Sequence, residues 1–291
     1  MGILDRILNY IKLSRIKHYL KNFLVFLPLI FSGNLLVKSY FVKCIIGVLI
    51  FSFTSSIVYI LNDIRDKDKD RNHPKKKQRP IASGKVSLKE AILLILFFIL
   101  FVVFLVCKIS LNLSGILLLV VYLLINICYS FGLKNIALVD LIILVFGFVI
   151  RVLFGGNLID VEVSNWLILT ILSIAFYLAL GKRRNELINV KKDTRKVLKY
   201  YTKEFLDKNM YMCLSLGIVF YSLWTVDSKI VANVGNNLIW TVPFVIIICM
   251  RYNMLVEGDS DGDPVEVVTH DIMMMCLILI YSILLVGILY L

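Results

Sequence analysis

Three aspartates share one short polar segment of the chain. Asp63, Asp66 and Asp70 are spaced i, i+3 and i+7. On an α-helix these positions fall within a sector of about 60°, so a helix continuing through the segment would turn the three carboxylates and Asn62 to one side. Carboxylates held together repel each other unless cations lie between them, and Mg²⁺ prefers a few carboxylates combined with phosphate oxygens and water. The spacing therefore predicts that the three aspartates, assisted by Asn62, bind one or two Mg²⁺ ions that also bind a diphosphate.

Basic residues follow the aspartates directly. They include His73, Lys76 and Arg79, and the segment ends in Arg79-Pro80-Ile81-Ala82-Ser83-Gly84. Because arginine and lysine bind the oxygens of phosphate groups, cations beside carboxylates suit a magnesium-diphosphate site. The alternative is a solvated loop in which acidic and basic side chains simply pair. Asp68 lies off the aspartate face, and we expect it to pair with a lysine in either case.

Five further cations are candidates for binding phosphate groups. They are Lys21, Lys134, Arg151, Lys182 and Arg183. Arg151 lies within an apolar segment, where a charge is costly and usually faces a cavity or a partner. The other four lie near the ends of apolar segments, where basic residues also simply anchor a helix at the membrane interface. Glu186 is a candidate for orienting Lys182 or Arg183.

Apolar segments on both sides of the aspartates are long enough to cross a membrane. The chain has 291 residues, 59% of them hydrophobic, and a mean hydropathy of +0.86, whereas a soluble domain is about 45–50% apolar. A helix of about 20 apolar residues crosses a hydrocarbon core of ~30 Å, and a helix satisfies its own backbone polar groups there. The pattern predicts an all-α integral membrane protein with nine transmembrane helices, at about 20–37, 41–61, 90–108, 112–131, 136–157, 164–181, 210–227, 237–256 and 272–290. The first is the weakest, because Lys21, Asn22 and Pro28 interrupt it.

The basic residues are distributed unevenly between the two sides of this predicted bundle. Only Lys38, Lys43, Lys108 and Lys229 fall on the side opposite the N-terminus, and Arg151 falls within a span. Loops rich in lysine and arginine stay cytoplasmic, so we expect the aspartates at the cytoplasmic face of a multi-pass protein of the plasma membrane. The net charge of +12 follows largely from this rule. No nucleic-acid motif accompanies it, so no nucleic-acid partner is expected.

The predicted helices form a single polytopic domain over residues 1–291. Residues 1–18 place Ile7, Leu8 and Ile11 at helical spacing among basic residues, which predicts an interfacial helix lying on the bilayer. Two cytoplasmic loops, at about 62–89 and 182–209, are expected to cap the active site. The cysteines lie in apolar spans without a CxxC or His/Cys cluster, which favours buried apolar filler over a disulfide framework or a metal site.

The aspartate segment resembles a known motif. Asn62-Asp63-x-x-Asp66-x-x-x-Asp70, followed by Arg79-Pro80-Ile81-Ala82-Ser83-Gly84, is similar to the first aspartate motif of the UbiA superfamily of membrane prenyltransferases. Within the superfamily, the chain resembles more closely the decaprenyl-phosphate phosphoribosyltransferase-like branch. That similarity also covers Arg15-Ile-Lys17-His-Tyr-Leu-Lys21-Asn22, Asp70-Arg71-x-His73-Pro74-x-Lys76, Tyr129-Ser130-x-x-Leu133-Lys134, Arg151, Gly181-Lys182-Arg183-Arg184-x-Glu186 and Gly262-Asp263-Pro264.

The resemblance implies a fold and a reaction. It implies nine transmembrane helices around a central cavity, with Mg²⁺ and a diphosphate held near the cytoplasmic side by Asp63, Asp66 and Asp70. The reaction implied is transfer of 5-phosphoribose from phosphoribosyl pyrophosphate to a polyprenyl phosphate, with release of diphosphate. The basic candidates would then hold the 5-phosphate of the donor and the phosphate of the lipid. The oligomeric state and the length of the lipid stay open.

Two departures from the family pattern bear on the alternatives. Aromatic prenyltransferases carry a second DxxxD motif after the sixth span, where this chain has Lys182-Arg183-Arg184-Asn185-Glu186. This disfavours, but leaves open, a prenyltransferase that uses a prenyl diphosphate and an aromatic or lipid acceptor. Tyr19 stands where the branch commonly has tryptophan. A membrane transporter is the second alternative, although its acids should lie within the spans rather than at one membrane face.

Overall fold

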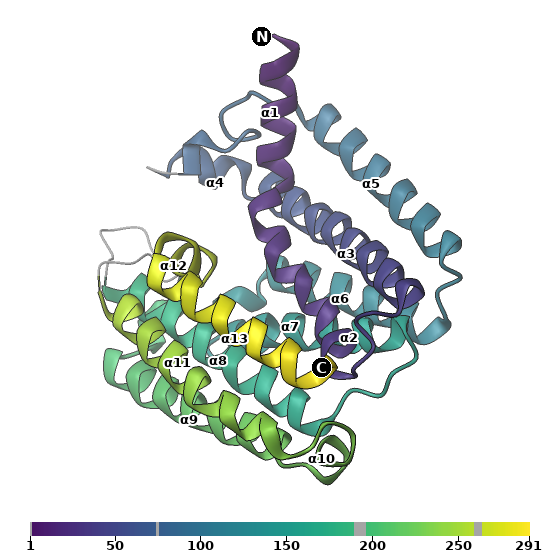
Figure 1. Ribbon diagram of the computed structural model, residues 1–291. Coiled ribbons are helices and arrows are strands. Elements are labelled where there is room, and N and C mark those ends of the chain that lie inside the picture. Colours follow the sequence, from purple (N-terminus) through teal and green to yellow (C-terminus); the bar gives the residue numbers. More distant parts are fainter. Residues whose placement is uncertain (1, 74–75, 189–195, 259–263) are drawn as a thin grey trace. The chain divides into compact units, whose positions relative to one another are not determined.

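All regular elements of the part of the chain that the structure describes are helices (Figure 1). This computed structural model describes residues 2–73, 76–188, 196–258 and 264–291. The α-helices are α1 (Ile3–Ser14), α2 (Leu27–Phe31), α3 (Lys38–Arg65), α4 (Lys67–Arg71), α5 (Leu88–Lys108), α6 (Leu113–Phe131), α7 (Val139–Leu158), α8 (Asn165–Ile188), α9 (Lys203–Thr225), α10 (Ser228–Val234), α11 (Val242–Glu257), α12 (Pro264–His270) and α13 (Ile272–Tyr290). Short 3₁₀ helices lie between them: η1 (Ile16–Phe26), η2 (Lys76–Gln78), η3 (Leu133–Asn135), η4 (Lys196–Tyr200) and η5 (Asn236–Thr241).

The long helices confirm the predicted all-α membrane class. Within the described residues, seven helical segments are long and apolar enough to cross a bilayer. They are α3, α5, α6, α7, α8, η5 joined to α11, and α13. The pair α9 and α10, bent by 53°, would be an eighth. The protein is thus a multi-pass integral membrane protein, and the predicted count of nine spans is not confirmed.

The first predicted span, 20–37, differs most from the sequence-based expectation. Its residues form most of η1, then the short α2, and then a turn in which Gly33 has φ +75°, so the span is not one regular helix. Asn22 explains part of the difference, because its side-chain amide donates to Ser52 Oγ at 3.0 Å instead of facing lipid. Pro28 has no backbone N–H to donate to a carbonyl of the preceding turn. The other predicted spans each coincide with a helix.

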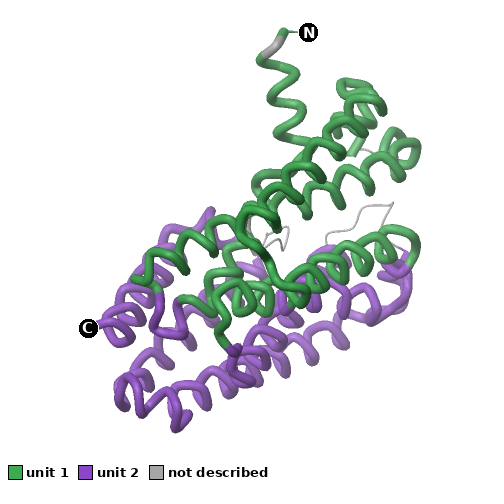
Figure 2. The backbone as a smooth tube through the Cα atoms, turned by 90° about the vertical axis from the view of Figure 1, so that its right-hand side faces the viewer, with its two compact units in different colours: residues 1–29, 35–132, 150–161 green, residues 30–34, 133–149, 162–291 purple. Residues whose placement is uncertain are grey.

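The chain divides into two compact units (Figure 2). The first comprises residues 1–29, 35–132 and 150–161, and the second residues 30–34, 133–149 and 162–291. Helix α7 begins in the second unit and ends in the first. Each unit has its own apolar core. Burial of these side chains is the main stabilising contribution available to each unit's packing.

The core of the first unit surrounds α3. Phe51 contacts Tyr122 and Phe154, with ring centroids 5.0 Å apart in both pairs. Gly155 permits a close backbone approach, since a Cβ placed there would lie 2.1 Å from the carbonyl oxygen of Val25. A small residue at this position of α7 is therefore required for η1 to pack against the helix.

The core of the second unit is formed mainly between α8 and α9. Its most buried side chains include Leu180, Leu206 and Met210. Gly217 of α9 lets the two helices approach closely, because a Cβ there would lie 2.7 Å from Ile174. The packing of α8 against α9 supports the polar C-terminal end of α8, residues 182–186, where Arg183 is fully buried.

Helix α1 has the predicted amphipathic pattern but ends earlier than residue 18. Leu4 is 71% exposed and Ile7, Leu8 and Ile11 are also exposed. The helix ends at Arg15, which has the left-handed φ of 53° that terminates an α-helix. A location on the bilayer surface stays a prediction.

Candidate active site

Two of the three aspartates are buried where α3 ends and α4 begins. Asp63 lies in the last turn of α3 and Asp70 lies in α4, each only 3% exposed. The helix is not continuous between them, because Asp66 leaves the helical conformation at φ −87° and ψ 8°. The break is small. Asp66 N–H still donates to Asn62 O at 2.9 Å, and Asp70 N–H to Asp66 O at 2.8 Å.

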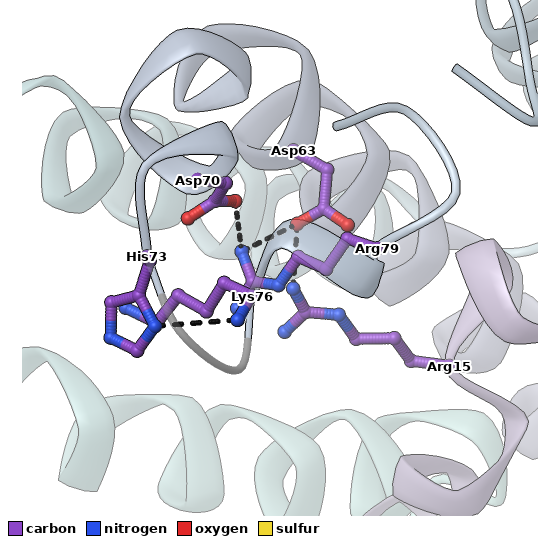
Figure 3. A network of polar contacts seen from close by, with 6 residues as sticks. All are labelled: Arg15, Asp63, Asp70, His73, Lys76 and Arg79. Carbon is purple, nitrogen blue, oxygen red and sulfur yellow. Dashed lines mark hydrogen bonds and ion pairs between the residues drawn. The ribbon is translucent and has the colours of Figure 1, made fainter. Parts of the chain in front are cut away.

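Arg79 joins the two buried carboxylates. Its Nη1 lies 3.1 Å from Asp63 Oδ1 and 2.6 Å from Asp70 Oδ2 (Figure 3). Arg15 Nη2 lies 2.6 Å from the same oxygen of Asp63. Two guanidinium groups therefore neutralise two carboxylates that burial would otherwise disfavour in the ionised form.

Local backbone structure positions Arg15 and Arg79 beside the two carboxylates. Arg15 has a left-handed backbone between α1 and η1, and its guanidinium reaches α3, where it lies 4.8 Å from the centre of the Tyr59 ring. Ser56 Oγ donates to the carbonyl of Ser14 at 2.8 Å, which ties the end of α1 to α3. Sequence reasoning included Arg15 in the family motif but not among the site residues. Nothing in its local sequence indicated that it reaches Asp63.

Arg79 begins a tight turn that explains the spacing of the Arg-Pro-Ile-Ala-Ser-Gly motif. Ser83 N–H donates to Arg79 O at 2.8 Å, and Val86 N–H donates to Pro80 O at 3.0 Å. Gly84 has φ +76°, a conformation that favours glycine. Ile81 is 1% exposed and anchors the turn in the core, so the arginine is held in place on a rigid support.

The donor chemistry at this cluster fits Mg²⁺. Asp63 and Asp70 converge on a single cationic nitrogen, so one cation already contacts both carboxylates. Carboxylate oxygens are the ligands that Mg²⁺ prefers. Within the described ranges, no group of three or more acidic, histidine or cysteine side chains is arranged to hold a metal ion, so the three-aspartate set stays a prediction. Asp66 is half-buried, and its place beside the other two carboxylates stays a prediction.

The remaining candidates of this segment lie around the buried pair. Asn62 is half-buried in α3, and His73 Nδ1 accepts a hydrogen bond from the backbone N–H of Lys76 at 3.3 Å. Asp68 is exposed, and among the described residues it pairs with Arg71 at 3.4 Å rather than with a lysine, because Arg71 lies one helical turn further along α4. Pro74 lies outside the described residues.

Arg151 lies in the core of the first unit. It is 6% exposed, and its Nε donates to Asn22 Oδ1 at 2.7 Å and its Nη2 to Tyr122 Oη at 2.9 Å. The guanidinium also lies 5.4 Å from the centre of the Phe51 ring and 4.9 Å from that of Tyr122. The expectation that a charge within a span faces polar partners is met. Lys21, the neighbour of Asn22, is half-buried.

The second unit holds the other candidates, and it joins two of them. Arg183 is fully buried, with Nε 2.7 Å from Asp140 Oδ2 and Nη1 2.9 Å from Glu186 Oε2. Glu186 thus contacts Arg183, one of the two partners that the sequence allowed. Lys134 in η3 and Lys182 in α8 are half-buried. Whether these cations bind phosphate stays a prediction.

Sequence reasoning missed Asp140 and Tyr201, which complete this cluster. Tyr201 Oη donates to Asp140 Oδ1 at 2.6 Å and accepts from the backbone N–H of Leu138 at 2.7 Å. Burial, followed by the hydrogen bond to Asp140, raises the pKa of Tyr201 to about 12. Asp140 did have a signal in the sequence, since it is an acid inside the predicted span 136–157, where an ionised group needs a partner.

Comparison with known proteins places this fold and these residues in a family. The sequence profile of the UbiA prenyltransferase family matches residues 24–256. The chain therefore belongs to the UbiA prenyltransferase family. A solved UbiA homologue from Archaeoglobus fulgidus, bound to GPP and Mg²⁺, matches the structure with a TM-score of 0.70 at 17% identity, covering 95% of this chain and 96% of that one. At that identity the match shows the fold alone, and it confirms the predicted UbiA-type fold.

The curated relatives define the branch more closely. The decaprenyl-phosphate phosphoribosyltransferase of Mycolicibacterium smegmatis is 31% identical over 276 residues, which are 90% of this chain and 86% of the relative. The protein of the same name from Mycobacterium tuberculosis is 30% identical over 272 residues, which are 90% of this chain and 87% of the relative. These relatives confirm the predicted decaprenyl-phosphate phosphoribosyltransferase-like branch. Gly262 and Asp263, part of the motif evidence for that branch, lie outside the described residues.

Proposed function

We propose that this protein transfers 5-phosphoribose from phosphoribosyl pyrophosphate to a polyprenyl phosphate, releases diphosphate, and depends on Mg²⁺. The names of its curated relatives support this reaction. The main structural support for the proposed reaction is that Asp63 and Asp70 both contact one cationic nitrogen, Nη1 of Arg79. A site that gathers buried carboxylates around positive charge suits a magnesium-diphosphate group better than it suits an uncharged substrate.

The residues of the chain would contribute orientation and charge. Asp63, Asp66 and Asp70 would hold Mg²⁺, with Asn62 assisting, and the bound ion would neutralise charge on the departing diphosphate. Arg15 and Arg79 keep Asp63 and Asp70 paired, which holds both carboxylates in place before substrate binds. Preorganised charge of this kind is the main electrostatic contribution that a protein makes to such a transfer.

The bond changes need no strong general base. The bond between the anomeric carbon of the ribose and the diphosphate oxygen breaks, and the electron pair leaves with diphosphate. A new bond forms between that carbon and an oxygen of the lipid phosphate, which is already ionised at neutral pH. The remaining basic candidates would hold the two phosphate groups in reacting geometry. They are Lys21, His73, Lys76, Lys134, Arg151 and Lys182.

The proposal places the reaction at the cytoplasmic face of the plasma membrane. The donor is a charged, water-soluble sugar phosphate, whereas the acceptor is anchored in the bilayer by its polyprenyl chain. A site at the mouth of a membrane bundle would reach both. That loops 62–89 and 182–209 cap this site, within a single functional domain, stays a prediction.

A donor assay tests the proposed function. Purified protein in lipid nanodiscs is incubated with labelled phosphoribosyl pyrophosphate and polyprenyl phosphate, and in parallel with a labelled prenyl diphosphate and an aromatic acceptor. We expect labelled lipid only in the first reaction, its loss in EDTA, and its recovery with added Mg²⁺. Product only in the second reaction would establish the prenyltransferase alternative instead.

Two matched variants tie the assay to the site. Asp63→Asn removes a buried carboxylate that contacts both arginines, and we expect a rate loss of at least 100-fold. Asp68→Asn removes an exposed carboxylate from the same segment, and we expect a rate within twofold of the original protein. Equal effects of the two substitutions would contradict the assignment of Asp63 to the reaction.

A further inference from the structure

The buried carboxylate of Asp140 organises a polar network in the second unit. Asp140 is fully buried in the first turn of α7. One of its oxygens accepts from Arg183 at 2.7 Å and the other from Tyr201 at 2.6 Å. A buried carboxylate is costly unless both oxygens are used, and here both are. The partners come from the end of α8 and from the residue after η4, so the carboxylate connects three separate segments.

Tyr201 extends the network to the backbone that precedes α7. Its hydroxyl accepts the N–H of Leu138 at 2.7 Å. Leu138 has φ +65°, a left-handed conformation that is unfavourable for a residue with a Cβ. The side chain of Leu138 is 52% exposed, so core packing does not hold it in place. The carbonyl of Leu138 accepts hydrogen bonds from the N–H groups of Leu141 and Ile142 at 3.1 and 2.9 Å, in the first turn of α7. The hydrogen bond from its amide to Tyr201 holds this strained residue from the other side, toward the connection before α7.

The backbone that Tyr201 fixes is the short connection that carries Lys134. Lys134 lies in η3, and Ile136 N–H donates to Leu133 O at 3.1 Å, so the connection is a compact turn. Asp140 N–H in turn donates to Ile136 O at 3.1 Å. A movement at Leu138 would therefore be transmitted directly to η3. Lys134 is half-buried, whereas Arg183 is fully buried with two carboxylates beside its guanidinium.

We propose that Asp140, Arg183 and Tyr201 are positioning residues that hold the 133–138 connection, so that Lys134 binds a phosphate monoester group of one substrate. This inference rests on the proposed function and deepens it. It also assigns Arg183 a role in positioning rather than in contact with phosphate. The phosphate group belongs either to the donor, as its 5-phosphate, or to the lipid.

A double-mutant cycle tests whether Tyr201 acts through Lys134. Tyr201→Phe keeps the ring and removes only the hydroxyl, and Lys134→Met removes the charge. We expect each single substitution to raise the KM for the same substrate about tenfold, and the double variant to be no worse than Lys134→Met alone. The substrate whose KM rises, phosphoribosyl pyrophosphate or polyprenyl phosphate, carries the phosphate that Lys134 binds. A KM for both substrates within twofold of the original in Tyr201→Phe, or additive effects in the double variant, would overturn the proposal.

Hydrogen exchange gives a second readout that does not depend on activity. In Tyr201→Phe the amide of Leu138 loses its acceptor, so we expect faster exchange in peptides covering residues 133–141. Tyr200→Phe is the matched control, because Tyr200 is 72% exposed, and it should change neither exchange nor KM. If the original protein transfers no phosphoribose, the proposed function fails. Unchanged exchange in Tyr201→Phe would by contrast overturn the network itself.

A second variant covers the case in which Tyr201→Phe is not recovered folded. Arg183→Lys keeps a positive charge but loses the Nε donor to Asp140. It takes the same two measurements, with the same expected tenfold rise in KM and faster exchange at residues 133–141. Unchanged values of both in a folded Arg183→Lys protein would again overturn the proposal.

Discussion

Replacing Arg79 by methionine should destabilise the protein and make it more dependent on Mg²⁺. Removing one partner of a buried ion pair costs about 3–5 kcal/mol, because a buried charge is left uncompensated. Here the side chains of Asp63 and Asp70 are almost fully buried, whereas the side chain of Arg79 is 26% exposed and Arg15 still pairs with Asp63. The exposure and the second arginine reduce the expected loss of unfolding free energy to about 2–3 kcal/mol in EDTA.

Magnesium should recover most of this loss. A ligand at about 100 times its Kd stabilises the folded state by ~2.7 kcal/mol, which is close to the expected loss. The assay is thermal unfolding of the detergent-solubilised protein, where 2–3 kcal/mol corresponds to a fall of about 4–10 °C in Tm. We expect that fall in EDTA, and a larger Mg²⁺-dependent rise in Tm for Arg79→Met than for the original protein.

A surface arginine provides the control. Arg71→Met removes a cation that pairs with the exposed Asp68, so we expect a change within about 1 kcal/mol and no altered response to Mg²⁺. The reasoning is refuted if Arg79→Met in EDTA unfolds at the Tm of the original protein. It is also refuted if Mg²⁺ raises the Tm of neither protein, since the two carboxylates would then not bind the ion.

Three further predictions follow from other contacts. Gly155→Ala should lower the unfolding free energy by about 1–3 kcal/mol, because its Cβ would meet Val25 O at 2.1 Å. Gly287→Ala in α13, with open space around it, should instead leave the unfolding free energy unchanged or raise it by up to about 1 kcal/mol in the same denaturation assay. Arg151→Met should cost about 2–4 kcal/mol in that assay, because Asn22 and Tyr122 lose a charged donor. The pKa of Tyr201, raised to about 12, means that its contribution to stability is complete below pH 10, the ordinary value, and is lost as the pH rises through 12. A pH titration of Tm should show this loss, and Tyr201→Phe should lack it.

The membrane helices could be predicted from composition because lipid imposes a simple rule on the backbone. A run of about 20 apolar residues has few alternatives to a helix there. The rule failed at residues 20–37, where Asn22 turns inward to Ser52 and Arg151, and where 3₁₀ structure replaces α-helix. Hydropathy measures the mean character of a segment and does not register one amide that finds a buried partner.

The candidate site was predictable only in part. The local spacing of Asp63, Asp66 and Asp70 identified the acidic segment, because those residues are close in sequence. Arg15 and Tyr201 could not be identified in this way, since each reaches its carboxylate across at least 48 residues. The break at Asp66 was also missed. The non-helical conformation of Asp66 depends on how α4 packs. The i, i+3, i+7 spacing of the aspartates does not contain that information.

Because Arg15 pairs with Asp63, the segment that contains α1 and Arg15 contributes to the candidate active site. Any version of the protein that starts beyond residue 15, or that carries a bulky fusion displacing α1, would remove one of two countercharges from the acid at the end of α3. A drop in turnover caused by such a version is easily mistaken for weaker membrane attachment. Comparing it with a full-length Arg15→Met protein would separate the two causes, because that variant keeps the apolar face of α1 intact.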